Sequence, residues 1–147
     1  TLRIEMGHVA GSELDGRTIP YDASLEGLVS KKKDFIGKRS LNRSAFTSTD
    51  REKLVGVVPI DKTTSIPEGS YIVKDPKAKL PNPKLGHVSA SCWSVEYDNP
   101  FSLAIIKDGK NMIGQKLFAM SPLKNKTIPV EIVSSHYVDP EGKRVRS

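Results

Sequence analysis

The stretch Lys53-Leu54-Val55-Gly56-Val57-Val58-Pro59-Ile60 decides the fold. It is almost wholly apolar and rich in β-branched side chains, which favour the extended backbone of a strand. A polar piece, Thr47-Ser48-Thr49-Asp50, lies just before it and marks a change in the character of the chain. We therefore predict that the sequence is all-β after about residue 50, with this stretch as its first strand.

Five further runs of the same kind follow, separated from one another by glycine or proline turns. Short strands at this spacing are typical of β-sandwiches and barrels, and we predict a closed or nearly closed, six-stranded antiparallel barrel. Proline cannot donate to a strand ladder, so the proline-rich interval Asp75–Pro83 is expected to be a surface loop. The five runs lie at residues 69–74, 85–91, 101–107, 115–120 and 127–133.

Residues 1–50 have a mixed character. Alternating apolar and charged side chains predict a strand at about residues 2–6. Asp22 is a suitable helix N-cap, and the apolar positions after it predict a helix at about residues 22–30. A second helix is expected at about residues 37–45.

Length and composition limit the class of protein to which this sequence can belong. A length of 147 residues accommodates one domain or two small ones, and 37% hydrophobic with 27% charged residues is typical of a folded globular protein. No apolar run approaches the roughly 18 residues that a membrane helix needs, and no signal-peptide pattern is visible. The single cysteine, Cys92, has no partner for an internal disulfide, so we expect a cytoplasmic setting. Because the first residue is Thr1, we expect the chain to be part of a longer polypeptide.

The basic balance, a net charge of +6 and a pI of about 9.4, invites a nucleic-acid interpretation. The charges are scattered, however, and no helix-turn-helix, zinc-finger or aromatic RNA-binding pattern is present, so we expect neither nucleic acid nor membrane as a partner. A polyanionic small ligand, an acidic neighbouring subunit or solubility alone explains the lysines equally well. No standard catalytic motif appears, and His8, His87 and His136 lack the spacing of metal ligands, so no metal site is expected.

The order of several short motifs carries more information. Leu2-Arg3-Ile4-Glu5-Met6-Gly7, followed by Glu13-Leu14-Asp15-Gly16-Arg17-Thr18-Ile19-Pro20, resembles the "LR-x-E-x-G … D-x-x-x-T-P" segment of the folate-dependent aminomethyltransferase family. That family includes the T-protein of glycine cleavage and the folate-binding parts of dimethylglycine dehydrogenase and of the heterotetrameric sarcosine oxidase α subunit. The resemblance covers nearly the whole chain and continues through residues 31–38, 66–69, 86–91, 103–106, 114–117 and 128–133.

Two segments are more similar to the sarcosine oxidase α subunit than to the T-protein. One is the lysine run with its following turn, Lys31-Lys32-Lys33-Asp34-Phe35-Ile36-Gly37-Lys38-Arg39. The other is Ser91-Cys92-Trp93-Ser94, where the T-protein tends to have Gly-Cys-Pro-Ser-Pro. The tryptophan after Cys92 is a departure from the T-protein pattern.

The resemblance implies an α+β arrangement. Residues 1–48 are then the C-terminal portion of a central, folate-binding α/β domain of ferredoxin-like type. Residues 49–140 are the six-stranded antiparallel barrel that ends the polypeptide, and residues 141–147 are a tail.

The resemblance also implies a ligand, tetrahydrofolate. Its pterin offers a paired donor edge, for which a carboxylate is a natural bidentate acceptor, and the family places a glutamate at the position of Glu5. The acidic folate tail calls for cations, and the family's arginine aligns with Lys33, which supplies charge without a planar fork. Tyr21 stacks on the pterin or packs beside Pro20, and Trp93 caps the cleft, contacts another subunit or joins the barrel core.

The implied parent enzyme oxidises sarcosine to glycine and passes the one-carbon unit to tetrahydrofolate. FAD, FMN and NAD then belong to upstream domains of the same polypeptide, which also has other subunits as partners. The catalytic aspartate of the family lies upstream, so no catalytic residue is assigned and the isolated chain is expected to be inactive. The alternatives are a T-protein-type aminomethyltransferase without flavin, and a non-enzymatic barrel that serves in subunit assembly or RNA contact.

Overall fold

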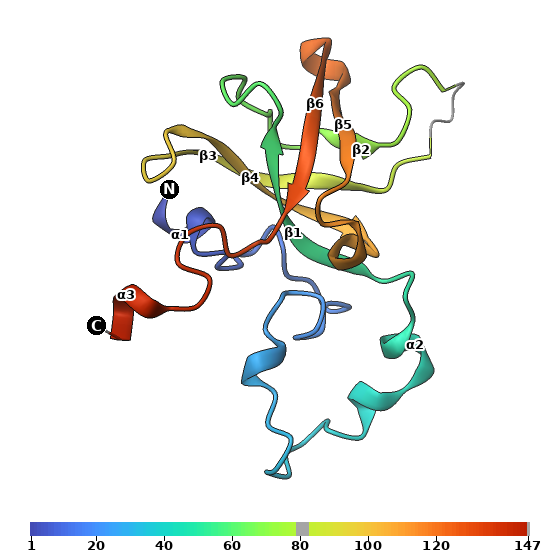
Figure 1. Cartoon of the computed structure of the whole chain (residues 1–147). Coiled ribbons are helices and arrows are strands. Elements are labelled where there is room, and N and C mark those ends of the chain that lie inside the picture. The colour runs from blue at the N-terminus through green and yellow to red at the C-terminus, as the bar shows by residue number, and fades with distance from the viewer. Residues whose placement is uncertain (79–82, 147) are drawn as a thin grey trace.

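The computed structural model describes residues 1–78 and 83–146, with the side chain of Val145 left aside. A barrel occupies the centre of the molecule, and the first 50 residues run along its outside and then away from it (Figure 1). The predicted loop at residues 75–83 falls partly outside the described residues. No helix in the described ranges is long and apolar enough to cross a membrane.

The barrel is the predicted one. Within the described residues its six strands follow the order β1-β4-β3-β2-β5-β6, and β6 pairs with β1 again, so the sheet closes on itself. Every pairing is antiparallel, and closure leaves no free strand edge. The strands are β1 (Glu52–Pro59), β2 (Tyr71–Val73), β3 (Gly86–Ser94), β4 (Asn99–Lys107), β5 (Lys116–Ser121) and β6 (Lys126–Val133).

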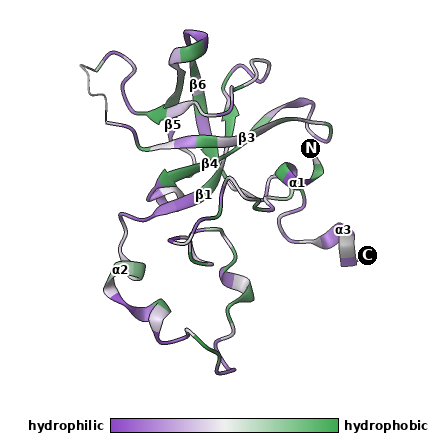
Figure 2. Cartoon of the chain, turned by 180° about the vertical axis from the view of Figure 1, so that it is seen from behind, coloured by the Kyte–Doolittle hydropathy of each residue, from purple (hydrophilic) through white to green (hydrophobic). Residues whose placement is uncertain are grey.

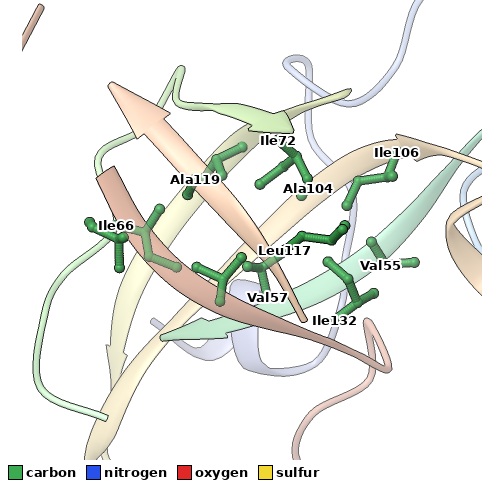
Figure 3. Close-up of a cluster of buried hydrophobic side chains, with 12 residues drawn as sticks. Val55, Val57, Ile66, Ile72, Ala104, Ile106, Leu117, Ala119 and Ile132 are labelled. Carbon is green, nitrogen blue, oxygen red and sulfur yellow. The ribbon is translucent and has the colours of Figure 1, made fainter. Parts of the chain in front are cut away.

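Alternate side chains of these strands fill the barrel interior. Figure 3 shows them converging from opposite walls, and Ile66 closes the space from the connection between β1 and β2. Interdigitated β-branched residues of this kind provide the main apolar burial of the fold. The interior cluster consists of Val55, Val57, Ile66, Ile72, Val88, Ala104, Ile106, Leu117, Ala119, Ile128, Val130 and Ile132.

Gly86 permits a close backbone approach between β3 and β4. A Cβ atom at this position would lie 1.9 Å from the carbonyl oxygen of Ile105 on β4, a contact that no side chain tolerates. Three residues later the pairing of β3 with β4 shifts register between Val88 and Ala90, which indicates a bulge. Glycine and bulge together let β3 bend around the barrel.

The start of the chain is a helix, and the predicted strand at residues 2–6 is wrong. The helix α1 (Leu2–Glu5) begins with the amides of Ile4 and Glu5 donating to the carbonyl of Thr1. It buries Ile4 against the outer face of the barrel, beside Phe101 and Leu103. Alternation over only four residues cannot distinguish a strand from one helical turn, and this contact decides between them.

The predicted helix at residues 22–30 is also wrong. Turns occupy that stretch, with one 3-10 turn, η1 (Glu26–Leu28). Ser24 has a positive φ of 59°, which a continuous helix excludes. Asp22 does not cap a helix either, because its carboxylate binds Arg51 and Lys53.

The second predicted helix, residues 37–45, is replaced by two short pieces. These are η2 (Ser40–Asn42) and α2 (Ser44–Thr47), and Arg43 between them has an extended backbone with ψ of 145°. Residues 1–48 contain no strand. The expected end of a ferredoxin-like α/β domain is therefore not in this chain.

None of the residues from 24 to 50 is buried. Hydrophobic and hydrophilic stretches alternate along this segment outside the barrel, as Figure 2 shows. The remaining helical pieces are η3 (Gly109–Met112) and η4 (Pro122–Lys124) between strands, and α3 (Lys143–Arg146) near the C-terminus. The terminal helices α1 and α3 lie on the same side of the barrel (Figure 1).

Candidate functional site

Glu5, one of the predicted site residues, is held through both its side chain and its backbone carbonyl. Its side chain is buried, and its Oε1 accepts a hydrogen bond from the amide of Val95, at 3.1 Å, where β3 ends. Its backbone carbonyl accepts hydrogen bonds from the amides of Tyr137 and Val138, both at 3.1 Å. No hydrogen bond joins the second carboxylate oxygen, Oε2, to any other described residue. Glu5 is therefore a fixed carboxylate with one oxygen still available.

Apolar side chains of residues close to Glu5, in α1 and at the end of β3, are exposed. Leu2 on α1 is 79% exposed, and Val95, whose amide binds Glu5, is 80% exposed. Trp93, two residues before Val95, is 47% exposed, and its indole Nε1 donates to Asp98 at 3.2 Å. Trp93 therefore does not belong to the barrel core, and the alternatives that remain for it are a ligand or protein contact.

The thiol of Cys92 also lies in the field of Glu5. Burial raises the pKa of this thiol, and the negative charge of Glu5 raises it further. A thiol with a raised pKa is a weak nucleophile at neutral pH. Cys92 is therefore unsuited to covalent chemistry beside Glu5.

Lys33 lies in a different part of the molecule. The lysine run is held as a turn by the ammonium of Lys38, which donates to the carbonyls of Lys33, at 2.7 Å, and Lys31, at 3.3 Å. Lys33 forms part of an apolar hollow of about 420 Å³ within the segment that extends away from the barrel in Figure 1. Its other wall residues are Pro20, Leu25, Leu28, Val29, Ser30, Asp34, Phe35 and Leu41.

The chain does not bring the four predicted site residues together. Among the main cavities formed by the described residues, only the hollow beside Lys33 includes any of them. Glu5, Tyr21 and Trp93 lie outside all of these cavity walls. These cavities of the described residues therefore do not form one pocket around the four predicted site residues.

A second cleft, which we call the loop cleft, separates the polar loop of residues 9–23 from the barrel. Its volume is about 420 Å³, and strands β1, β3 and β4 form its other wall. The described residues contain no group of three or more His, Cys, Asp or Glu side chains arranged to hold a metal ion. The wall residues are Val9, Gly11, Ser12, Glu13, Leu14, Asp15, Arg17, Thr18, Asp22, Ala23, Glu52, Leu54, His87, Ile105 and Lys107.

Asp22 fastens this loop to the first barrel strand. Its carboxylate accepts hydrogen bonds from the guanidinium of Arg51, from the ammonium of Lys53, at 2.8 Å, and from the amide of Ile19, at 3.2 Å. Burial raises the pKa of Asp22, but these donors outweigh it, so the pKa is lower than the ordinary value. The carboxylate is therefore ionised and structural at neutral pH.

Sequence reasoning missed Glu13 and the partners of Asp22. Arg51 is 29 residues from Asp22, and no local pattern announces a pair at that separation. Glu13 looks like one more charge in a polar loop, yet its side chain is almost completely buried. No local feature of the sequence distinguishes it from the other charged residues of the loop.

These features define a class of protein: a small closed antiparallel barrel whose preceding segment runs along its outside and places a fixed glutamate at its side. Residues 52–139 match the family of the glycine cleavage T-protein C-terminal barrel domain. The match covers more than half of the sequence, and the chain belongs to this family.

The relatives extend the similarity to the first 50 residues. The chain is 36% identical over 146 residues to the sarcosine oxidase subunit alpha of Rhizobium meliloti (strain 1021), with 98% of this chain covered. It is 37% identical over the same length to the sarcosine oxidase subunit alpha of Corynebacterium sp. (strain P-1), and 30% identical over 137 residues to an aminomethyltransferase of Synechococcus sp. (strain CC9902). The chain spans about 15% of the sarcosine oxidase subunits and 34% of the aminomethyltransferase.

A solved structure confirms the fold. The aminomethyltransferase T of the glycine cleavage system from Bartonella henselae superposes with a TM-score of 0.69 over 94% of this chain and 37% of that protein. The two sequences are 22% identical, so this likeness concerns the fold alone.

Proposed function

We propose that this chain is the folate-binding C-terminal part of a sarcosine oxidase α-type subunit, and that Glu5 binds the pterin of tetrahydrofolate. The observation that carries the proposal is the geometry of Glu5. The bond from Val95 orients the carboxylate while Oε2 has no partner among the described residues. The identity of 36–37% to sarcosine oxidase α subunits, against 30% to the aminomethyltransferase, favours the oxidase within the family.

The chemistry of the proposed reaction divides between this chain and the rest of the subunit. A flavin held by the upstream domains would accept two electrons and two protons from sarcosine, which would become a methylene imine. Tetrahydrofolate bound beside this chain would take up the methylene carbon on two nitrogens, and the two protons that these nitrogens give up would go to glycine as it leaves. In this scheme Glu5 holds the pterin through charge-assisted hydrogen bonds, and the upstream domains hold the flavins, the nicotinamide cofactor and the amine.

The exposed surface near Glu5 supports a site shared with other parts of a larger protein. Leu2, Trp93 and Val95 present apolar area beside a carboxylate that no described cavity includes. We propose that Trp93 and Tyr21 contact the ligand or the upstream domains, and that Lys33 supplies positive charge for the folate tail. We also propose a hetero-oligomer in the cytoplasm, where the lone Cys92 stays reduced.

The test uses the full-length subunit with its cofactors. Glu5→Gln keeps an oxygen for the Val95 amide but removes the charge, and we expect tetrahydrofolate to bind about tenfold more weakly or worse, because a charge-assisted bond contributes about 1.5–3 kcal/mol. Isothermal titration measures this, and Glu26→Gln, an exposed carboxylate paired with Lys110, is the matched control. Equal affinity of the Glu5 variant and the wild type for tetrahydrofolate would show that Glu5 does not bind the ligand.

Product analysis separates the oxidase from the alternative. In the Glu5 variant we expect sarcosine oxidation to continue while water replaces folate as the acceptor, so formaldehyde accumulates in place of methylenetetrahydrofolate. A full-length protein that binds no flavin and does not oxidise sarcosine would instead favour the aminomethyltransferase. The identity of 30% over 137 residues to an aminomethyltransferase of Synechococcus sp. (strain CC9902) supports this second candidate.

A further inference from the structure

Glu5 is held by two parts of the molecule that are far apart in the chain. The turn that follows β3, at residues 95–98, supplies the amide of Val95, which donates to Oε1 of Glu5. The segment that follows β6 supplies the amides of Tyr137 and Val138, which donate to the backbone carbonyl of Glu5. The orientation of this carboxylate therefore depends on how the hairpin turn and the C-terminal segment are held relative to each other.

The ring of Tyr137 connects these two parts. It stacks on the ring of Phe101 on β4, with the centroids 4.3 Å apart and the planes inclined by 5°. It also contacts the ring of Tyr97 in the hairpin turn, with the centroids 4.6 Å apart and the planes inclined by 57°. Aromatic pairs in such arrangements stabilise a contact beyond the area that they bury. The residue whose amide binds Glu5 thus also contacts the turn that contains Val95.

The hydroxyl of Tyr137 is held as well. Nδ2 of Asn99 donates to it, with a distance of 3.0 Å between the two atoms. Asn99 is buried, and it pairs with Ser94, the residue before Val95, in the register of β3 and β4. Because ring and hydroxyl both have partners in the hairpin, Tyr137 cannot rotate away without breaking several contacts at once.

The helix that carries Glu5 is packed against the same region. Ile4 belongs to the apolar cluster on the outer face of the barrel, and Tyr137 packs against that cluster. After the helix, a Cβ atom at Gly7 would lie 2.6 Å from the carbonyl oxygen of Ser135, so the chain passes very close to the C-terminal segment. The backbone of Glu5 therefore lies between two close contacts, and its position follows that of the C-terminal segment.

We propose that Tyr137 is a positioning residue for Glu5: it couples the C-terminal segment to the hairpin turn and so sets the carboxylate in the orientation that binds the pterin. The inference rests on the proposed function, because its consequence is the affinity for tetrahydrofolate. A carboxylate that is already oriented loses less conformational freedom when it binds a paired donor edge, and it binds more tightly for that reason. Tyr137 acts through Glu5 and does not itself touch the ligand.

The test uses the full-length subunit with its cofactors and isothermal titration with tetrahydrofolate. Tyr137→Leu removes both ring contacts and the hydroxyl, and we expect the ligand to bind about threefold to tenfold more weakly. Tyr137→Phe keeps the two ring contacts and should retain most of the affinity. Tyr71→Leu, at an exposed tyrosine on β2, is the matched control and should bind as the wild type does.

A double-mutant cycle with Glu5→Ala distinguishes positioning from a direct or a merely structural role. Glu5→Ala removes the carboxylate, so Tyr137→Leu should then change the affinity by less than about twofold. Equal losses in both backgrounds would overturn the proposal, because Tyr137 would not act through Glu5. No loss in Tyr137→Leu beside a clear loss in Glu5→Ala would also overturn it and leave the proposed function standing. Unchanged affinity in Glu5→Ala alone would contradict the proposed function, and this inference with it.

Tyr97→Leu keeps the proposal testable if Tyr137→Leu does not fold. Tyr97 is exposed, so its replacement leaves the barrel interior intact while it removes the ring contact in the hairpin turn. We expect an affinity about threefold weaker, and no such loss in the Glu5→Ala background. Circular dichroism of each variant checks the fold. Unchanged affinity in Tyr97→Leu, or a loss that persists without the Glu5 carboxylate, would contradict the proposal.

Discussion

The barrel buries its apolar side chains, whereas the segment of residues 24–50 leaves its apolar side chains exposed or half-buried. In the barrel, Val57, Ile72 and Ile106 are completely or almost completely buried, and every strand pairs with two neighbours. In the segment no residue is buried, Leu28 is 80% exposed and Ile36 is fully exposed. The barrel is organised by its own interior, whereas the segment depends on attachments at its ends.

Those attachments are polar and few. Asp22, just before the segment, pairs with Arg51 and Lys53, just after it. Within the segment, Oε1 of Glu26 lies 2.6 Å from Nζ of Lys110, which is in η3 of the barrel. Helical pieces of three or four residues add little, since isolated helices need about 12–15 residues to be even marginally stable in water. The barrel therefore holds itself together through its interior, whereas the segment is held to the barrel by a few polar contacts.

The largest effect is expected inside the barrel. Ile106→Ala removes part of a completely buried side chain in the interior cluster and should lower the free energy of unfolding by about 2–5 kcal/mol. Urea denaturation followed by circular dichroism measures this. Leu123→Ala, at a fully exposed position between β5 and β6, is the control. A loss of similar size in both variants would contradict the distinction between interior and surface.

An intermediate effect is expected at the attachment. Asp22→Asn keeps the oxygen that binds the Ile19 amide but removes the charge opposite Arg51 and Lys53, and should cost about 2 kcal/mol at pH 7. Because pairing lowers the pKa of folded Asp22, its stabilisation is present above the unfolded-chain value near 3.8 and is lost as the pH falls below it. The gap between wild type and variant should therefore narrow toward pH 3.

Urea denaturation at pH 7 and at pH 3 measures that gap. The matched control is Asp15→Asn, whose carboxyl pKa is lowered to about 2, chiefly by the side-chain hydrogen bond from Arg17. That pair is exposed, so little change is expected at pH 7. A gap for Asp22→Asn that stays constant or widens in acid would rule out the ion pair as its source.

The smallest effect is expected in the segment of residues 24–50. Leu28→Ser replaces an exposed leucine and should change the free energy of unfolding of the isolated chain by no more than about 0.5 kcal/mol. Thermal unfolding beside Ile106→Ala measures the contrast. A loss comparable with that of the barrel variant would mean that the segment contributes a core of its own.

The strands were predictable because each carries its own signal. β-branched runs such as Val55–Val58, separated by turn residues, specify extended structure locally, and six of them leave few architectures that bury their inner faces. The helices of the first 50 residues were not predictable in this way. Their apolar periodicity is short, and the contacts of Ile4 and Asp22 with the barrel outweigh the weak local propensity.

The candidate site was predictable only in part. The family motif pointed to Glu5, and the structure places it as a fixed carboxylate, but the role of folate ligand stays a prediction. The four predicted site residues were expected around one ligand, and the structure separates Lys33 from Glu5. Glu13 had no distinguishing local feature, because the burial of a charged loop residue depends on what packs over it.

The sequence by itself determined the barrel and the family of this protein, because strand patterning and motif order are written in neighbouring residues. The tertiary structure alone decided the path of residues 1–50, the orientation of Glu5 by Val95 and the burial of Glu13. These depend on contacts between residues that are far apart in the chain, and the energies of such contacts have no local signature.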